Sequence, residues 1–134
     1  MTDFSKNKPV YHPHNKELRD KLSVMNAKFM GKDESFDPFY GAQELLIVLA
    51  NKAMPTYLYD GTLVLGNLMN AAADLGVDSC WINFFDPEAA AKELHLPENE
   101  EVLMLLDLGY AAEGASPLAN HSQRKELSET VKYI

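Results

Sequence analysis

The sequence predicts a single layered domain in which helices pack on a β-sheet. Short apolar runs, each consistent with a strand, lie at residues 44–50, 79–84 and 102–106. Between them, apolar residues recur at three- and four-residue steps, the spacing of one helical face. The 134 residues are enough for one domain with its own core. The alternation of strands and helices therefore predicts a mixed α/β layered architecture.

The first helix is predicted over residues 16–29, after an extended polar arm at residues 1–14. Asn15 is expected to cap this helix, because its side-chain oxygen can accept hydrogen bonds from the first N–H groups. Gly31 follows where the helix is expected to end. The apolar residues that fall on one face of the helix are Leu18, Leu22, Met25 and Phe29.

The second helix is predicted over residues 60–75, after the aliphatic strand and a loop around Pro55. Asp60 is a candidate cap for it. Gly76 follows, and glycine readily adopts the left-handed conformation that ends many helices. Small residues allow another surface to approach this helix closely: Gly66, Ala71, Ala72 and Ala73.

The second strand contains Cys80, which we expect to be a buried, unreactive thiol because no cation lies beside it in the sequence. Asp86 is predicted to cap a short helix that begins at Pro87 and stops before Pro97.

The C-terminal quarter of the chain is predicted to be a loop and a tail. A loop with Gly, Ser, Pro and Asn occupies residues 111–123, after the third strand. The tail at residues 124–134 ends in an apolar segment, so we expect an edge strand or a docking arm there.

The composition excludes several classes of partner. Twenty acidic residues against twelve basic ones give a net charge of -8, which disfavours binding to nucleic acid and to anionic membranes. No apolar run approaches the roughly 20 residues that span a bilayer. The N-terminus has no secretion-signal core, and a single cysteine fits a reducing compartment. We therefore expect a cytoplasmic location.

Several short motifs follow one another in a characteristic order. Tyr40-Gly41-Ala42 precedes the aliphatic strand, Asp60 precedes a Leu/Ala-rich helix, and Leu75-Gly76-Val77-Asp78-Ser79-Cys80-Trp81-Ile82 follows that helix. In this order they resemble the nitroreductase family of FMN-dependent NAD(P)H oxidoreductases. The resemblance implies an α+β fold, a nitroreductase-like domain over residues 1–134 with a central mixed β-sheet surrounded by helices.

The resemblance also implies an interlocked homodimer. Its surface would come from the central helix, the tail acting as a docking arm, and aromatic residues before the first strand. These are Phe36, Phe39 and Tyr40.

The resemblance implies a cofactor site built mostly from main chain. Ile82, Asn83 and Phe84 would pass the edge of the flavin ring, where fixed N–H donors stabilise the electron-rich reduced ring. Arg124 and Lys125 would bind the FMN phosphate. No catalytic side chain is expected, because the cofactor supplies the chemistry. The alternative interpretation is a plain strand end with core aromatics and a solvated basic pair.

The sequence departs from the family at its beginning. The Arg-x-Ser-x-Arg motif that normally opens family members is not found, so we expect an N-terminally truncated member with weakened FMN binding. His12 and His14 have no cysteine or carboxylate at ligand spacing, so we expect no metal site.

The implied activity is transfer of electrons from NAD(P)H through FMN to a nitroaromatic, quinone or similar small-molecule acceptor. A second hypothesis is a relative with weak or no FMN binding that acts as an interaction module. A third is a structural α/β domain without a ligand.

Overall fold

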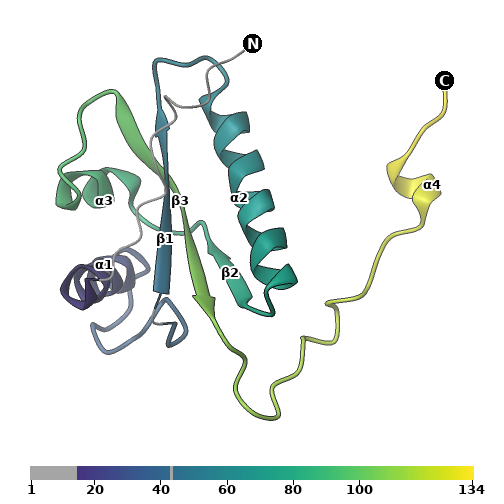
Figure 1. The fold of residues 1–134 in the computed structure, drawn as a ribbon, viewed down its shortest axis with the longest axis horizontal. Coiled ribbons are helices and arrows are strands. Elements are labelled where there is room, and N and C mark those ends of the chain that lie inside the picture. Colours follow the sequence, from purple (N-terminus) through teal and green to yellow (C-terminus); the bar gives the residue numbers. More distant parts are fainter. Residues whose placement is uncertain (1–14, 43) are drawn as a thin grey trace.

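The computed structural model describes residues 15–42 and 44–134, and the body of the protein is a three-stranded sheet covered by helices on both faces (Figure 1). α1 and α3 pack on one face of the sheet, and α2 packs on the other. This arrangement confirms the predicted α+β class. The elements follow in the order α1 (Lys16–Phe29), β1 (Glu44–Asn51), α2 (Tyr57–Asp74), β2 (Asp78–Ile82), α3 (Pro87–Glu93), β3 (Glu100–Gly109) and α4 (Leu127–Thr130).

The sheet has the order β1-β3-β2, and both outer strands run antiparallel to β3. β1 and β2 run in the same direction but are never adjacent, because β3 lies between them. The described part of the sheet is therefore antiparallel throughout, whereas the resemblance implied a mixed sheet. The register between β1 and β3 shifts between Val48 and Leu49, which leaves Leu103 without a partner, as in a β-bulge.

The sheet face toward α1 and α3 holds the larger part of the core. Phe39 belongs to it and is fully buried. We had expected Phe39 on a partner surface, and this was wrong because the connection before β1 folds its ring into the chain's own core. The cluster consists of Leu22, Phe39, Leu45, Ile47, Ile82, Phe85, Ala90, Val102 and Leu105.

The other sheet face is covered by α2 alone. Leu65 of α2 packs with Leu46, Val48 and Leu106 of the sheet. The opposite side of α2 has no cover within the described chain. Its large exposed residues include Leu58, Tyr59, Leu63 and Val64.

Two predicted helix caps, Asn15 and Asp86, are confirmed by hydrogen bonds from backbone N–H groups two and three residues ahead. The Asn15 side chain accepts hydrogen bonds from the N–H groups of Glu17 and Leu18 at 3.0 and 3.3 Å. Asp86 caps α3 in the same way, with bonds of 3.1 and 3.0 Å. Gly76 ends α2 with a φ of 71°, in the left-handed region as predicted.

α2 begins earlier than predicted, so Asp60 is not its cap. The helix starts at Tyr57, and the Asp60 carboxylate instead accepts a hydrogen bond of 2.8 Å from the Thr56 hydroxyl. Tyr57, Gly61 and Leu65 recur at four-residue steps and are half-buried or buried against the sheet. This burial extends the helix by nearly one turn beyond the position that the capping pattern indicated.

Residues 110–134 form an arm that extends away from the body (Figure 1). Every residue of the arm is exposed, and its only regular element is the single turn of α4. The predicted loop at residues 111–123 is confirmed. An edge strand at the end of the tail is not formed, because the backbone there lies beside no strand of its own chain.

Candidate functional site

The turn that follows β2 carries the first group of predicted site residues. Ile82 is the last residue of β2 and is buried, whereas Asn83 and Phe84 are exposed. Phe85 then turns back into the core and anchors the turn to the body. The chain therefore presents two consecutive residues to solvent between two buried anchors.

The main-chain N–H groups of this turn are available as donors. Ladder pairing ends at Ile82, which lies opposite Leu105. Neither Asn83 nor Phe84 hydrogen-bonds through its N–H to any residue in the described part of the chain. Unpaired N–H groups at an exposed turn fit the requirement for donors to an electron-rich ring edge.

A pair of aromatic rings lies at the turn. The Phe84 ring lies 5.1 Å from the ring of Phe29 at the end of α1, with an interplanar angle of 52°. This tilted pairing has the geometry that aromatic quadrupoles favour. Phe84 remains 62% exposed and Trp81 of β2 remains 45% exposed, so both offer flat apolar surface to a ligand or to another chain.

The second group of predicted site residues, Arg124 and Lys125, lies on the arm. Both are exposed, and the arm extends away from the body that carries Asn83 and Phe84 (Figure 1). Arg124 donates from Nη1 to the backbone oxygens of His121 and Gln123 at 2.9 and 2.7 Å. A single chain therefore does not bring the basic pair to the turn.

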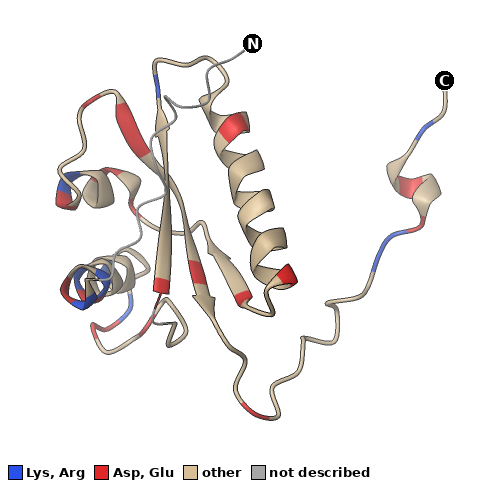
Figure 2. Cartoon of the chain, in the orientation of Figure 1, with Lys and Arg blue, Asp and Glu red and all other residues tan. Residues whose placement is uncertain are grey.

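Figure 2 shows how charge is distributed around these two groups. α2 contains no Lys or Arg, and its only acidic residues are Asp60 and Asp74, near its two ends. The long stretch between them is uncharged, and its exposed side carries the apolar Leu63 and Val64 together with the polar Thr62, Asn67 and Asn70. The arm carries basic residues at Arg124, Lys125 and Lys132.

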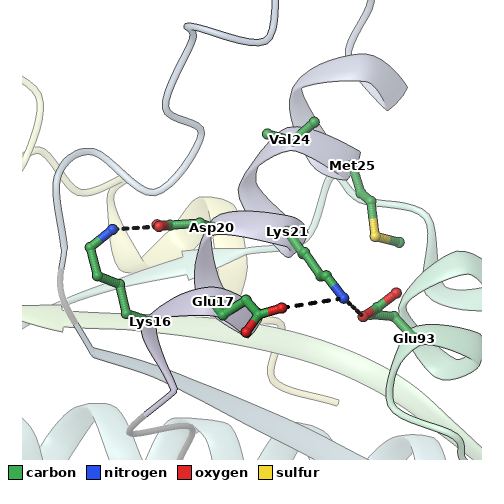
Figure 3. Close-up of a pocket in the computed structure, with 7 residues that line it drawn as sticks. All are labelled: Lys16, Glu17, Asp20, Lys21, Val24, Met25 and Glu93. Atoms are coloured by element: carbon green, nitrogen blue, oxygen red, sulfur yellow. Dashed lines mark hydrogen bonds and ion pairs between the residues drawn. The ribbon is translucent and has the colours of Figure 1, made fainter.

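A shallow groove of about 730 Å³ lies between α1 and α3, away from the predicted residues (Figure 3). Its charged groups are already paired with one another: Lys21 lies 3.2 Å from Glu93 and 3.9 Å from Glu17, and Lys16 pairs with Asp20. These pairs leave the groove with compensated charge, and it contains none of the residues predicted to bind flavin.

Two groups beside the site differ from expectation. Cys80 is exposed and not buried, because β2 is an edge strand of the sheet. Partial desolvation and the nearby Asp107 raise the pKa of the Cys80 thiol, so it is not an activated nucleophile. Asp107 was not predicted at all, although one acid inside the apolar run of β3 is a visible signal.

Asp107 is a buried acid in the central strand, with 3% of its surface exposed. Neither of its carboxyl oxygens has a hydrogen-bond partner in the described part of the chain. Burial raises the pKa of Asp107 to about 7; Arg19 lowers the pKa and Asp37 raises it further. Such a group is partly neutral at neutral pH.

Among residues 15–42 and 44–134, no cluster of three or more His, Cys, Asp or Glu side chains is placed to hold a metal ion. None of the described helices has the length and apolar character needed to cross a bilayer.

The family model described as "Nitroreductase family" matches residues 7–110. The chain therefore belongs to the nitroreductase family. No curated protein matches it significantly.

Solved structures share the fold over most of this chain. A nitroreductase family protein from Clostridium difficile 630 is 27% identical, with a TM-score of 0.72 over 93% of this chain and 72% of its own. A nitroreductase with bound FMN from Bacteroides fragilis is 28% identical, with a TM-score of 0.68 over 92% of this chain and 73% of its own. A nitroreductase with bound FMN from Desulfitobacterium hafniense is 19% identical and has a TM-score of 0.70 over 93% of this chain and 74% of its own, which shows the shared fold alone.

Proposed function

We propose that this chain is an FMN-dependent oxidoreductase that passes electrons from NAD(P)H to a nitroaromatic, quinone or similar acceptor. Family membership and the FMN bound to the Bacteroides fragilis relative support this proposal. The observation in this chain that carries it is the turn at Asn83 and Phe84, which offers unpaired main-chain N–H groups beside exposed aromatic rings.

Bound FMN would supply the redox chemistry between NAD(P)H and the acceptor. The chain's own residues would bind and orient the ring. The N–H groups of Asn83 and Phe84 would donate to the flavin, whose reduced ring is electron-rich. Their positions are held by the buried Ile82 and Phe85, so these donors need little reorganisation.

We propose further that the functional unit is a homodimer. The uncovered side of α2 exposes 73% of Tyr59 and 68% of Leu63, and water contact with so much apolar surface is unfavourable. The arm at residues 110–134 is exposed throughout and extends from the body far enough to lie on another copy (Figure 1). A second copy would cover α2 with its own apolar surface.

The same assembly would complete the phosphate site. Arg124 lies apart from the turn in one chain, but the arm of a second copy can carry it to the turn of the first. The two hydrogen bonds that Arg124 donates to the backbone oxygens of His121 and Gln123 both use Nη1. Nε and Nη2 remain available for the paired bonds that Arg makes with phosphate.

The absorbance spectrum of freshly purified protein tests the proposal, together with sedimentation analysis. We expect a yellow dimer that oxidises NAD(P)H when an acceptor such as menadione is added. A monomer that is colourless, and whose melting temperature does not change with excess FMN, would rule out the flavin site. The variant Glu98→Gln, which changes an exposed residue between α3 and β3, is a suitable control for unrelated surface effects.

The second candidate function is a cofactor-poor interaction module. The observation that favours it is the uncovered side of α2, where Leu58, Tyr59 and Leu63 are exposed and could pack on a partner chain. A colourless protein that nevertheless dimerises through α2 would support this function over the first.

A further inference from the structure

We propose that Asp107 is a proton-controlled latch: when its carboxyl group is protonated, α1 packs on the sheet, and when it ionises, α1 loosens. This inference concerns the described fold itself and does not depend on flavin binding. Residues opposite one another in an antiparallel pair point to the same sheet face. Asp107 lies opposite Leu45 of β1 and Cys80 of β2.

Leu45 identifies the face toward which Asp107 points. Leu45 belongs to the core cluster that also contains Leu22 of α1 and Ala90 of α3. Asp107 therefore lies under these two helices and not under α2. Its 3% exposure agrees with this position. A carboxyl group in such a layer strongly favours its neutral form unless a cation or hydrogen-bond donors hold the charge.

The groups around Asp107 do not supply that compensation. From β1 it meets the apolar Leu45, and α3 presents Ala90 and Ala91 to this face. From β2 it meets the Cys80 thiol. Neither Asp107 oxygen finds a hydrogen-bond donor within residues 15–42 and 44–134.

The cation that acts on Asp107, Arg19, already bonds to other groups. The Arg19 guanidinium of α1 bonds to the Asp37 carboxylate at 2.8 Å and to the Ala42 carbonyl oxygen at 3.1 Å. Arg19 favours the ionised form of Asp107, whereas the negative charge of Asp37 opposes it. Ionised Asp107 thus lacks a dedicated counter-ion on the described chain.

α1 is the element expected to respond. Its buried side already carries a second unsatisfied group, since Asn26 is 4% exposed and neither amide atom has a partner among the described residues. α1 is held by the core contacts of Leu18 and Leu22, by the part-buried ion pair of Arg19 with Asp37, and by surface ion pairs such as Lys21–Glu93. Of these attachments, the core contacts are the ones that an ionised Asp107 would weaken.

The latch has a consequence for the candidate site. α1 ends at Phe29, whose ring packs on Phe84 of the turn after β2. Loosening of α1 would therefore remove the ring that supports Phe84. The same proton would then influence both the packing of α1 and the shape of the turn.

The direction of the pH effect follows from linkage. In an opened state Asp107 meets water and has its ordinary pKa of 3.8, whereas in the closed state its pKa is about 7. The closed state is therefore favoured at low pH and loses stability as the pH rises from 3.8 to about 7. Between pH 5.5 and 7.5 the opening equilibrium of α1 should increase about 20-fold.

Hydrogen exchange of backbone amides tests this, in the wild type and in Asp107→Asn, with rates corrected for the intrinsic effect of pH. We expect the amides of α1 to lose about 20-fold protection between pH 5.5 and 7.5 in the wild type and to stay constant in Asp107→Asn. The amides of α2 are the internal control and should not change. The latch would be overturned if the protection of the α1 amides depended on pH equally in both proteins. It would also be overturned if the α2 amides lost as much protection as those of α1.

If Asp107→Asn folds poorly, a titration of the Asp107 carboxyl group in the wild-type protein tests the proposal instead. The carboxyl carbon of Asp107 can be followed by NMR in the wild-type protein. A midpoint near 7 supports the latch, and a midpoint near 4 overturns it.

Discussion

Gly61 of α2 lies directly against Leu103 of β3. A Cβ atom added to Gly61 would overlap Cδ1 of Leu103 and lie 3.5 Å from its Cγ. Leu103 is the residue that the β-bulge leaves without a partner. The missing side chain at Gly61 and the bulge at Leu103 together let the helix approach the sheet. Gly66, one and a half turns further along α2, has nothing within 4 Å of the corresponding position.

Gly61→Ala should therefore be less stable than Gly66→Ala by about 1–3 kcal/mol, the usual cost of overpacking. Both changes remove a glycine from a helix interior, which by itself stabilises by about 0.5–1 kcal/mol. The difference between them isolates the contact with Leu103. Urea unfolding measures it, and in a Leu103→Ala background the penalty should vanish. Equal stability of the two variants would show that Leu103 moves aside freely.

Asp37 ties the connection before β1 to α1. Its carboxylate accepts hydrogen bonds from Arg19 Nη2 at 2.8 Å, Ser23 Oγ at 3.3 Å, and the N–H groups of Phe39 and Gly41 at 3.0 and 2.9 Å. Burial disfavours its ionised form, but these donors outweigh burial and lower the pKa of Asp37. We expect Asp37→Asn to lose about 1.5–3 kcal/mol of unfolding free energy at pH 7.

The pH dependence of Asp37→Asn gives a second measurement. A lowered pKa means that the wild type gains stability from Asp37 above the ordinary value of 3.8 and loses it as the pH falls through the lowered value. The variant should lose less stability than the wild type on acidification below pH 4. Asp33→Asn, in the same connection but with only local bonds, serves as the control. A larger loss in that control would count against the role of Asp37.

His95 ends α3 in a strained conformation, with a φ of 53°. The N–H group of Leu96 reaches back to the Ala91 carbonyl oxygen at 2.9 Å, which is the bonding of a glycine-type helix end. His95→Gly should raise the unfolding free energy by about 0.5–1 kcal/mol, because glycine adopts this conformation without a steric penalty. His95→Ala should give no such gain. Thermal or urea unfolding distinguishes the two.

Arg124→Ala tests the proposed phosphate contact. If Arg124 binds the FMN phosphate, affinity should fall about 10- to 100-fold, from the loss of one charge-assisted interaction. Quenching of flavin fluorescence measures the affinity. Lys132→Ala removes another cation from the same arm and should leave the affinity nearly unchanged. Unchanged affinity in Arg124→Ala would place the phosphate elsewhere.

Local features were predictable from the sequence. The bounds of α1, the caps at Asn15 and Asp86, and the end of α2 at Gly76 agree with prediction, because each depends on hydrogen bonds within a few residues. The start of α2 was missed, since its first turn is held by burial against the sheet and not by a cap at Asp60. The site prediction at Asn83 and Arg124 came from a resemblance, and no local pattern brings the two residues together, because they lie far apart in a single chain (Figure 1).

The sequence by itself determined the kinds and order of the elements and the family, because periodicity, capping residues and motif order act over short distances. Only the tertiary structure decided that Phe39 is core, that Cys80 is exposed on an edge strand, and that Asp107 is buried without a partner. The reason is that burial is a property of distant segments brought together. The order β1-β3-β2 sets which residues are covered, and no local pattern in the chain specifies that order.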